Sequence, residues 1–411
     1  MRADPEHSLD YYLVGGAVRD RLLGLDVNDR DWVVVGATPE LMVARGFKPV
    51  GKDFPVFLHP VTHDEYALAR TERKTGPGYK GFSVYASTDV RLEDDLRRRD
   101  LTINAMAQTR DGELIDPFGG ASDLDNRILR HVSPAFAEDP VRILRVARFA
   151  ARYADLGFTV ADNTNALMSA MIRDGEVDAL VAERVWTELQ SALGESRPSQ
   201  FIVTLRECGA LARIFPEIDR LFGIPQSARR HPEIDTGAHT LLTVDQAAAA
   251  TATIRARYAA LVHDLGKGLT PPQRWPNHRG HDRSGLEPIR RLNSRLRVPN
   301  AFARLALLVC AQHLKMHRLD TLKAHAVLAL LESLDALRRP EIIVDFSAAC
   351  RADARGRSGH GTRPYPQAEL LQRCCEVARG VDSNTLGLQG HAIGAEIRRR
   401  RVVAIDELLR G

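Results

Sequence analysis

The sequence contains few cysteines and no long apolar run. Its five cysteines are scattered, and no C-x-x-C pair is present, so we expect reduced thiols and neither a disulfide framework nor a zinc site. No stretch of about 18 consecutive apolar residues occurs, and the first ten residues, MRADPEHSLD, contain no apolar core of a signal peptide. These absences predict a cytoplasmic protein that does not span a membrane.

Lysine is also scarce, because only seven of the 57 basic residues are lysines. The net charge of +4 and the isoelectric point of about 8.8 are weak evidence for an anionic partner. Arginine can bind phosphate through two parallel hydrogen bonds. An arginine bias of the genome explains the same skew equally well.

The 411 residues are too many for one ordinary core, so several domains are expected. Short apolar runs alternate with turns up to about residue 135, and helical periodicity continues beyond it. We therefore expect a multi-domain α+β protein with a mixed-sheet head over residues 1–135, followed by all-α segments over 136–225, 226–350 and 351–411. Within the head, strands are predicted over residues 11–14, 31–36, 55–60 and 65–70, and helices over 38–46 and 92–108.

Two glycines mark the turn between the first strand and a short helix that ends near Gly24. Because Gly15 and Gly16 lack Cβ atoms, a phosphate can approach the backbone N–H groups at the start of this helix. Arg19 lies in the first helical turn, where it can reach the same phosphate. The turn matches neither G-x-G-x-x-G nor the Walker A motif, and a purely structural turn is the alternative.

Two aspartates, Asp29 and Asp31, follow this helix at a spacing that places both on one side of a strand. Neighbouring like charges are unfavourable unless a cation neutralises them. Mg²⁺ binds carboxylate and phosphate oxygens together, and such ions can activate a hydroxyl and stabilise a leaving pyrophosphate. We predict that both aspartates are catalytic metal ligands. A solvated strand end is the alternative.

A helix with an arginine-rich face is predicted over residues 138–153, where Asp139 precedes Pro140 as an N-cap residue precedes proline at the first helical position. At about 100° per residue, four arginines share an arc of roughly 120°: Arg142, Arg145, Arg148 and Arg152. This arc contains no acid, so we expect one buried face and one cationic face that attracts a polyanion. A solvated arginine face is the alternative.

The helical part contains His263 next to Asp264 in an apolar stretch, where the pair is costly without a partner. Further histidines lie on both sides of this pair in the sequence: His239, His278, His281 and His313. Imidazoles and carboxylates together suit a transition metal such as Ni²⁺, Mn²⁺ or Co²⁺, whose bound water can attack a phosphate.

Three segments, LVGGAVRDRLLGLDVNDRDWVVVG, RRRDLTINAMA and EDPVRILRVARFAARY, resemble the class II tRNA nucleotidyltransferases of the polymerase-β-like superfamily. The chain is most similar to the bacterial CCA-adding enzymes that carry an HD domain. The resemblance covers nearly the whole chain and implies a head, a helical neck, an HD domain and a tail with the boundaries given above. It also implies that Asp29 and Asp31 hold Mg²⁺ and that the following residues bind the nucleotide: Gly16, Arg19, Arg99, Asp139, Arg142, Arg145 and Arg148.

The same resemblance assigns the choice of base to Asp139 and Arg142. A carboxylate accepts and a guanidinium donates hydrogen bonds, which complements the pairing edges of cytosine and adenine and mismatches those of uracil and guanine. Each unpaired buried polar group costs about 1–3 kcal/mol, so two mismatches discriminate by roughly 10²- to 10⁴-fold. This fits an enzyme that uses only CTP and ATP.

His239, His263, Asp264 and His313 resemble the metal-binding set of HD phosphohydrolases. In similar enzymes an aspartate follows the last of these histidines, whereas Leu314 follows here. We therefore expect either that Asp282 or Asp320 replaces it, or that the phosphatase and 2′,3′-cyclic phosphodiesterase activities are reduced. A scaffold without hydrolytic activity is the alternative.

Two further segments give weaker expectations. Residues 69–81 are predicted to form a mobile loop in which Glu72 assists catalysis or orients an arginine. The run Arg398–Arg401 is a candidate phosphate-binding patch, although a solvated helix end is the simpler interpretation.

The predicted function is template-independent addition of C, C and A to the 3′ end of tRNA, with the helical part binding the acceptor arm through shape and backbone charge. The rival functions are a poly(A) polymerase-like tailing enzyme and a phosphohydrolase whose head senses nucleotide. A monomer and a homodimer are both compatible with the sequence.

Overall fold

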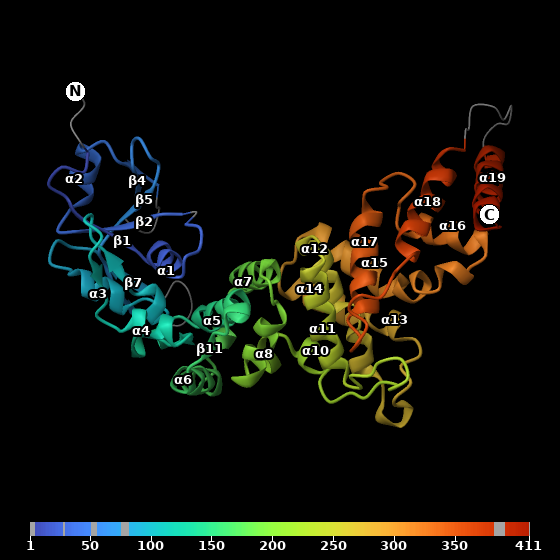
Figure 1. The fold of residues 1–411 in the computed structure, drawn as a ribbon, viewed down its shortest axis with the longest axis horizontal. Helices are drawn as coiled ribbons and strands as arrows, with labels where there is room; N and C mark the ends of the chain where they lie inside the picture. The colour runs from blue at the N-terminus through green and yellow to red at the C-terminus, as the bar shows by residue number, and fades with distance from the viewer. Residues whose placement is uncertain (1–4, 28, 51–55, 75–81, 382–390, 411) are drawn as a thin grey trace. The chain divides into compact units, whose positions relative to one another are not determined.

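The computed structural model describes residues 5–27, 29–50, 56–74, 82–381 and 391–410, and the side chains of residues 72–84 and 391–392 lie outside this description. The chain forms two compact units. Unit 1 comprises residues 1–188 and 203–214, and unit 2 comprises residues 189–202 and 215–411. Figure 1 shows that strands are concentrated in the first part of the chain, whereas the later part is helical.

Unit 1 contains a seven-stranded sheet with the order β3-β4-β5-β2-β1-β8-β9. Its strands are β1 (Asp10–Val14), β2 (Asp31–Val35), β3 (Lys48–Pro49), β4 (Val56–Leu58), β5 (Glu65–Leu68), β8 (Ala107–Gln108) and β9 (Leu114–Ile115). The sheet is mixed, because β2 pairs in parallel with β5 and antiparallel with β1. Two small sheets pair β6 (Thr71–Lys74) with β7 (Phe82–Tyr85) and β10 (Ile128–Leu129) with β11 (Thr159–Val160).

The large sheet is buried on both faces, which explains the continuous apolar run in β2. Val34 packs in one hydrophobic cluster with Met42 of α2 (Pro39–Ala44), whereas Val33 packs in another with Leu96 of α3 (Leu92–Arg97). Successive side chains of a strand point to opposite faces, so the two helices cover opposite sides of the sheet. The mixed-sheet head predicted from the sequence is thereby confirmed.

The other helices of unit 1 surround and follow this sheet. They are α1 (Gly16–Leu22), α4 (Gly120–Asp125), α5 (Val141–Tyr153), α6 (Asp162–Arg173), α9 (Ala210–Ile214) and parts of α7 (Ala182–Gly194) and α8 (Ser199–Glu207). The predicted helix end near Gly24 is confirmed, because Gly24 follows the C-cap residue Leu23 and has a φ of +69°.

The single helix predicted over residues 92–108 is wrong. Helix α3 ends at Arg97, a 3₁₀ turn covers Thr102–Asn104, and β8 follows. The helix is interrupted because the Asp100 carboxylate accepts hydrogen bonds from the Leu101 backbone N–H and from Asn104. Such local side-chain bonds compete with helical ones.

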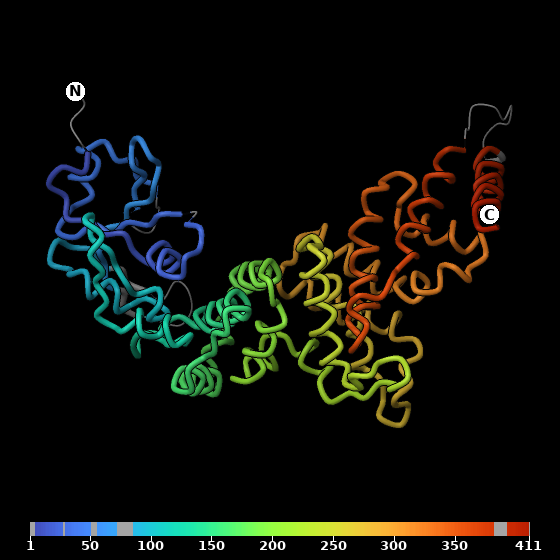
Figure 2. Tube along the Cα trace, viewed as in Figure 1, coloured from blue at the N-terminus to red at the C-terminus, as the bar shows by residue number. Residues whose placement is uncertain are grey.

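The elements of unit 2 are helices joined by loops, and within its described residues no strand is present apart from one isolated bridge between Pro225 and Asp235. Its main helices are α10 (Pro216–Asp219), α11 (Thr236–Ala249), α12 (Ile254–Val262), α13 (His281–Ser284), α14 (Leu286–Arg295), α15 (Asn300–Met316), α16 (Ala324–Ser333), α17 (Ile342–Arg355), α18 (Gln367–Arg379) and α19 (His391–Arg410). Helix α12 packs against α11, α15 and α17, and these four helices form the centre of the unit. Their course can be followed in the tube of Figure 2.

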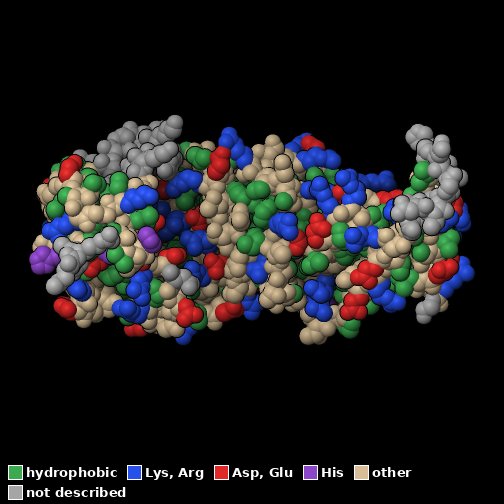
Figure 3. Space-filling model, turned by 90° about the horizontal axis from the view of Figure 1, so that it is seen from above, with side chains coloured by type: hydrophobic (Ala, Val, Ile, Leu, Met, Phe, Trp, Pro, Cys, Tyr) green, Lys and Arg blue, Asp and Glu red, His purple; other side chains and the backbone are tan. Residues whose placement is uncertain are grey.

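All five cysteines are buried and unpaired, which confirms the prediction of free thiols. Among the described residues, no helix is both long and apolar enough to cross a membrane. Basic and acidic side chains are interspersed over the face shown in Figure 3.

Candidate functional site

The strand register brings one of the predicted metal ligands beside the glycine turn. Strands β1 and β2 pair antiparallel with Val14 opposite Asp31. Gly15 and Gly16 directly follow Val14, so the start of β2 lies next to the turn that leads into α1. Asp31 is the first residue of β2, and its backbone position therefore depends on the whole β1–β2 ladder.

Asp29 precedes the strand, so the prediction that both aspartates project from one strand is wrong. The two carboxylates nevertheless interact. The surrounding chain displaces water from Asp31 and so raises its pKa, although part of its surface is exposed. The positive charge of Arg99 opposes this shift, and the negative charge of Asp29 adds to it. A divalent cation would relieve the repulsion between the two carboxylates.

Arg99 lies directly against the glycine turn. A Cβ atom at Gly15 would be 2.8 Å from Arg99 Nη1, and Gly15 has a φ of +67°. The Arg99 guanidinium is held by Asp95 Oδ2 at 3.2 Å and by the Asn104 carbonyl at 3.4 Å. Its buried Nε has no hydrogen-bond partner within the described part of the chain. The absence of a side chain at position 15 thus makes room for a guanidinium beside Asp31.

Arg19 is a buried support of this turn, with 4 % of its surface exposed. Its Nε and Nη2 donate to the two oxygens of Asp20 at 2.8 and 3.0 Å, and its Nη1 donates to Asn104 Oδ1. These partners hold the guanidinium 3.4 Å from the position of a Cβ at Gly16. A direct contact from Arg19 to a nucleotide stays a prediction.

A chain of polar contacts links the glycine turn to α5 and α7. Asn104 donates to Asp100, whose other oxygen lies 2.6 Å from Arg145 Nε, and Glu188 lies 4.0 Å from Arg145 and 2.7 Å from Arg148. Burial acts to raise the pKa of Asp100, but the Arg145 charge and the hydrogen bonds outweigh it and hold the pKa well below its usual range. The chain fixes α5 relative to the turn.

The prediction of an unneutralised cationic face on α5 is therefore wrong, although the helix itself contains no acid. Acids from other segments neutralise it: Arg145 pairs with Asp100, Arg148 with Glu188, and Arg152 with Asp20. Arg142 is itself buried, and its Nη1 donates to the Ala135 carbonyl. Helix α5 is consequently buried on nearly all sides.

The predicted base-reading pair, Asp139 and Arg142, lies at the start of α5. Asp139 Oδ1 accepts from the Val141 N–H at 3.1 Å, as expected of a capping carboxylate. Arg184 of α7 holds both Asp139 oxygens, at 3.0 and 2.7 Å. A carboxylate offers about four acceptor positions, so Asp139 keeps capacity to accept from a base. Sequence spacing gave no sign of Arg184.

Two other predictions concern Glu72 and the arginine run near the C-terminus. The side chain of Glu72 lies outside the described residues. The four arginines near the C-terminus contact protein groups: Arg398 pairs with Glu332, Arg399 and Arg400 pair with Glu396, and Arg401 donates to the Ala378 carbonyl. These contacts favour the interpretation as an ion-paired helix.

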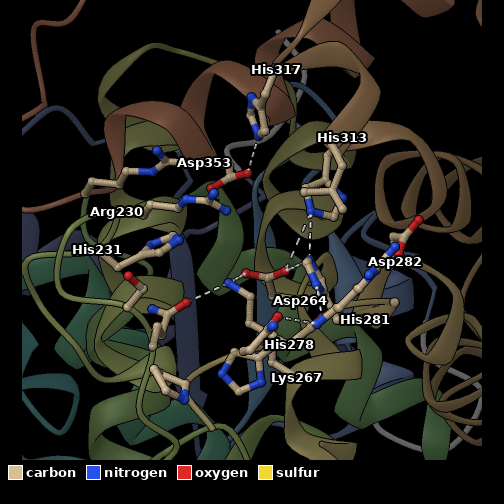
Figure 4. Close-up of a pocket in the computed structure, with 18 of the residues that line it drawn as sticks. Arg230, His231, Asp264, Lys267, His278, His281, Asp282, His313, His317 and Asp353 are labelled. Carbon is tan, nitrogen blue, oxygen red and sulfur yellow. Dashed lines mark hydrogen bonds and ion pairs between the residues drawn. The ribbon is translucent and has the colours of Figure 1, made fainter. Parts of the chain in front are cut away.

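The second site lies in unit 2, where four packed helices each contribute one polar side chain. His239 lies on α11, His263 ends α12 and is followed by Asp264, His313 lies on α15, and Asp353 lies on α17. Each of the five is at most 4 % exposed. Figure 4 shows Asp264, His313 and Asp353 facing a common space. The structure thus brings together the three histidines and the one aspartate of the predicted HD site, and it adds Asp353.

These groups are close enough to share a cation. His239 Nε2 lies 3.0 Å from Asp353 Oδ1, and His263 Nε2 lies 3.1 Å from Asp264 Oδ2 and 3.7 Å from Asp353 Oδ2. Burial alone would lower the pKa of His263, but Asp264 and Asp353 outweigh it and raise the pKa to about 9. The negative charge that retains this proton would equally bind a metal ion.

Asp353 was missed because two of the histidines that it meets, His239 and His263, lie 114 and 90 positions away in the sequence. A local signal existed, since Phe346, Ala349, Cys350 and Asp353 share one buried face of α17. An acid that continues an apolar stripe is costly unless it is paired or coordinates a metal.

Two side chains outside the cluster orient its members. Glu233 Oε1 lies 2.9 Å from His239 Nδ1, which directs the other ring nitrogen toward Asp353. His317 Nε2 lies 2.6 Å from Asp353 Oδ2, and its Nδ1 lies 2.9 Å from the Tyr365 hydroxyl. Carboxylate partners of this kind fix the tautomer of a metal-binding histidine.

The cluster opens into a cavity of about 1360 Å³. Leu314 lines it and offers no carboxylate, whereas the Asp353 carboxylate belongs to one donor group with His239 and His263. Asp282 lines the same cavity but belongs to no donor group, and Asp320 does not line it. Basic side chains surround the cavity, including Arg229, Arg230, Arg283, Arg318 and Arg357. A cationic lining suits an anionic substrate.

Comparisons with known proteins match families to both units. A family model described as the poly A polymerase head domain matches residues 11–130, a probable RNA and SrmB-binding site of polymerase A matches 157–222, and the HD domain matches 236–354. Together with the fold, these matches define a polymerase-type nucleotidyltransferase head followed by an HD domain.

Relatives that match nearly the whole chain identify the family more narrowly. The multifunctional CCA protein of Methylococcus capsulatus is 61% identical and covers 97% of this chain and 94% of its own length. That of Thioalkalivibrio sulfidiphilus is 59% identical, with 97% and 98% covered. A solved CCA-adding enzyme in apo form II has the same fold, with a TM-score of 0.69 at 20% identity over 98% of this chain and 89% of that one. The chain belongs to the family of multifunctional CCA proteins.

Proposed function

We propose that this chain adds C, C and A in turn to the 3′ end of tRNA, with CTP and ATP as substrates and no nucleic-acid template. Family membership supports this proposal, as does the position of Asp31 opposite Val14, beside the glycine turn and Arg99. That register is the observation on which the proposal chiefly rests.

Asp29 and Asp31 are the residues that would hold Mg²⁺, and their mutual repulsion fits such an ion. Bound there, Mg²⁺ would neutralise the triphosphate charge. The tRNA 3′-hydroxyl loses its proton to solvent water, and its oxygen forms a bond to the α-phosphorus. The bond from the α-phosphorus to the bridging oxygen breaks, and pyrophosphate leaves with that electron pair. Gly16 admits the triphosphate to the backbone at the start of α1, and Arg99 donates to it.

Base choice falls to Asp139 and Arg142 at the start of α5. Asp139 accepts from the amino group of cytosine or adenine, and Arg142 donates to the neighbouring ring nitrogen. Arg184 holds the Asp139 carboxylate by two hydrogen bonds and so positions it. Arg145 and Arg148, which pair with Asp100 and Glu188, support this helix. The sequential change from C to A depends on the RNA end.

Nucleotide incorporation on tRNA lacking its 3′ CCA tests the proposal. With CTP alone we expect two additions and a stop, and ATP then adds one A. Asp29→Asn and Asp31→Asn should abolish extension, whereas Asp26→Asn, an exposed acid in the same segment, should not. A long A tail from ATP would favour the poly(A) polymerase rival. Extension by the Asp31 variant would refute the metal assignment.

We also propose that unit 2 is a metal-dependent phosphohydrolase. His239, His263, Asp264 and Asp353 would hold a transition metal such as Ni²⁺. Two buried atoms, His263 Nε2 and Asp264 Oδ1, have no hydrogen-bond partner among the described residues, which fits such an ion. The metal would supply an activated water. Hydrolysis of a 2′,3′-cyclic nucleotide should be lost in Asp353→Asn and unaffected by Asp31→Asn. Retained hydrolysis in Asp353→Asn would argue for a scaffold.

The remaining expectations stand as proposals: a head, neck, HD domain and tail divided at about residues 135, 225 and 350, a cytoplasmic location, and a monomer or homodimer.

A further inference from the structure

We infer that three arginines at the cavity of unit 2, Arg229, Arg230 and Arg357, bind a second phosphate of the substrate, next to the phosphate that reacts. This inference rests on the proposed hydrolytic function of the same unit. The second phosphate is the phosphodiester that joins the last two nucleotides of an RNA strand. Unit 2 would accordingly prefer RNA 3′ ends over free nucleotides.

The three arginines lie in segments that flank the HD domain. The HD family model matches residues 236–354, whereas Arg229 and Arg230 precede this range and Arg357 follows it. All three nevertheless line the cavity into which the histidine and aspartate cluster opens. The flanking segments therefore add a basic wall that is no part of the matched domain.

One carboxylate joins these two flanking segments. Glu233 Oε1 lies 3.1 Å from His231 Nδ1, and Glu233 Oε2 accepts a hydrogen bond from the Ser358 backbone N–H at 3.1 Å. Burial is the main cause that lowers the pKa of His231 to about 3, and the positive charge of Arg357 contributes, so Arg357 lies near this ring. Because Arg230 directly precedes His231, the arginines of both segments are held at the same part of the cavity.

The described part of the chain does not neutralise this basic wall. Within it, none of the three arginines forms an ion pair or a side-chain hydrogen bond, and the buried Nε of Arg357 has no partner. By contrast, acids of other segments neutralise the arginines of α5 and α19. Neighbouring like charges are unfavourable without a counter-charge, and guanidinium groups bind phosphate oxygens through paired hydrogen bonds. The wall is therefore suited to a phosphate.

Arg357 is also close to the cluster along the chain. It comes four residues after Asp353 of α17, which corresponds to roughly 6 Å along a helix axis. Gly356, the residue between the end of α17 and Arg357, keeps a helical φ of −70°. A phosphate bound by the long Arg357 side chain can therefore be the neighbour of one that reacts at the cluster.

The cavity has room for more than one nucleotide. Its volume of about 1360 Å³ exceeds the range of roughly 300–1,000 Å³ that is usual for the pocket of one small ligand. In Figure 4, Arg230 and His231 lie on one side of Asp264, whereas His281 and Asp282 lie on the other. A strand whose last phosphate reacts beside Asp264 can thus extend toward Arg230.

The chemistry of a cyclic phosphate indicates what the second anion is. A 2′,3′-cyclic phosphate in RNA occupies the ribose at the 3′ end, so the nearest further anion is the phosphodiester on the 5′ side of that ribose. In the hydrolysis, water adds to the cyclic phosphorus, one of its two ester bonds to the ribose breaks, and a proton of the water passes to the released ribose oxygen. The phosphodiester on the 5′ side is unchanged and serves only for binding.

A comparison of two substrates on the full chain loaded with Ni²⁺ tests this inference. One is 2′,3′-cyclic AMP, and the other is the dinucleotide CpA with a terminal 2′,3′-cyclic phosphate. We expect the KM of the dinucleotide to be lower by roughly 10- to 150-fold, as a hydrogen bond to a charged group provides, at similar kcat. Arg357→Gln and Arg230→Gln should each reduce this preference. Arg283→Gln removes the same charge from α13 at the same cavity and should retain it.

Isothermal titration provides a readout without turnover. Adenosine 3′,5′-bisphosphate carries a phosphate on both sides of its ribose and should bind more tightly than adenosine 3′-monophosphate. Arg357→Gln and Arg230→Gln should reduce this difference. Arg230 is exposed, so its variant decides the question if Arg357→Gln does not fold.

The outcomes separate the phosphate site from the hydrolytic function. Equal KM values for the two substrates, or a preference that persists in both arginine variants, would overturn the second phosphate site and leave the hydrolase proposal intact. An equal loss of preference in Arg283→Gln would show that only the total charge of the cavity matters, which would overturn the assignment to this wall. If neither substrate is hydrolysed, the hydrolase proposal fails, and the titration alone decides whether the wall binds a phosphate.

Discussion

Substitution of Gly15 by alanine tests whether Arg99 lies beside the bound triphosphate, because the new side chain would both strain the backbone and displace Arg99. Gly15 has a φ of +67°, and the new Cβ would lie 2.8 Å from Arg99 Nη1. With a ψ of −126° this backbone conformation is sparsely populated, and it costs roughly 1–3 kcal/mol for a non-glycine residue. Arg99 must also move away, and losing a hydrogen bond to a charged group costs about 1.5–3 kcal/mol. The proposed contact to the triphosphate then disappears, so kcat/KM for CTP should fall by roughly 10- to 150-fold.

Gly24→Ala is the matched control. Gly24 has a φ of +69°, but nothing lies within 4 Å of an added Cβ. Gly15→Ala should therefore lose more stability than Gly24→Ala in urea unfolding monitored by circular dichroism, because only Gly15→Ala displaces Arg99, and only Gly15→Ala should lose CTP incorporation. Equal activity losses in the two variants, or full activity in Gly15→Ala, would refute the placement of Arg99 beside the triphosphate.

Three other substitutions test separate contacts. Asp100→Asn should destabilise the protein at pH 7 by roughly 2–3 kcal/mol, less than the loss of a fully buried pair, because Arg145 is partly exposed. Since the pKa of Asp100 is lowered in the folded state, the unsubstituted protein should lose this advantage in urea unfolding as the pH falls below about 4. A stability difference that does not change with pH would contradict this reasoning. Arg184→Met should raise misincorporation of UTP relative to CTP, with the exposed Arg173→Met as control and unchanged selectivity as the contrary result. Glu233→Gln should weaken Ni²⁺ binding by roughly 10- to 100-fold in a competition titration, and unaltered affinity would show that Glu233 does not orient His239.

Much of the head could be predicted from the sequence because its signals are local. The apolar run of β2 indicated a strand, and the glycine turn and the two aspartates lie within 17 residues of each other in the printed sequence. The exact start of β2 could not be predicted, because it depends on pairing with β1. Asp29 therefore lies before the strand instead of on it.

What the sequence did not reveal depends on distant partners. The arginines of α5 looked unneutralised because their acids, Asp20, Asp100 and Glu188, belong to other segments. Asp353 looked like an ordinary helical acid because the histidines that it meets are far away along the chain. Helical periodicity shows which side of a helix is buried but not which charged group it meets there.

The most direct test of the central claim is the position of the metal in the head. Crystals of the full chain with CTP and Mn²⁺, a substitute for Mg²⁺ with anomalous scattering, would locate it. The account predicts an anomalous peak that contacts the carboxylates of both Asp29 and Asp31 and an oxygen of the triphosphate beside Gly16. A triphosphate bound at this turn with its metal on other residues, or with none, would contradict the account.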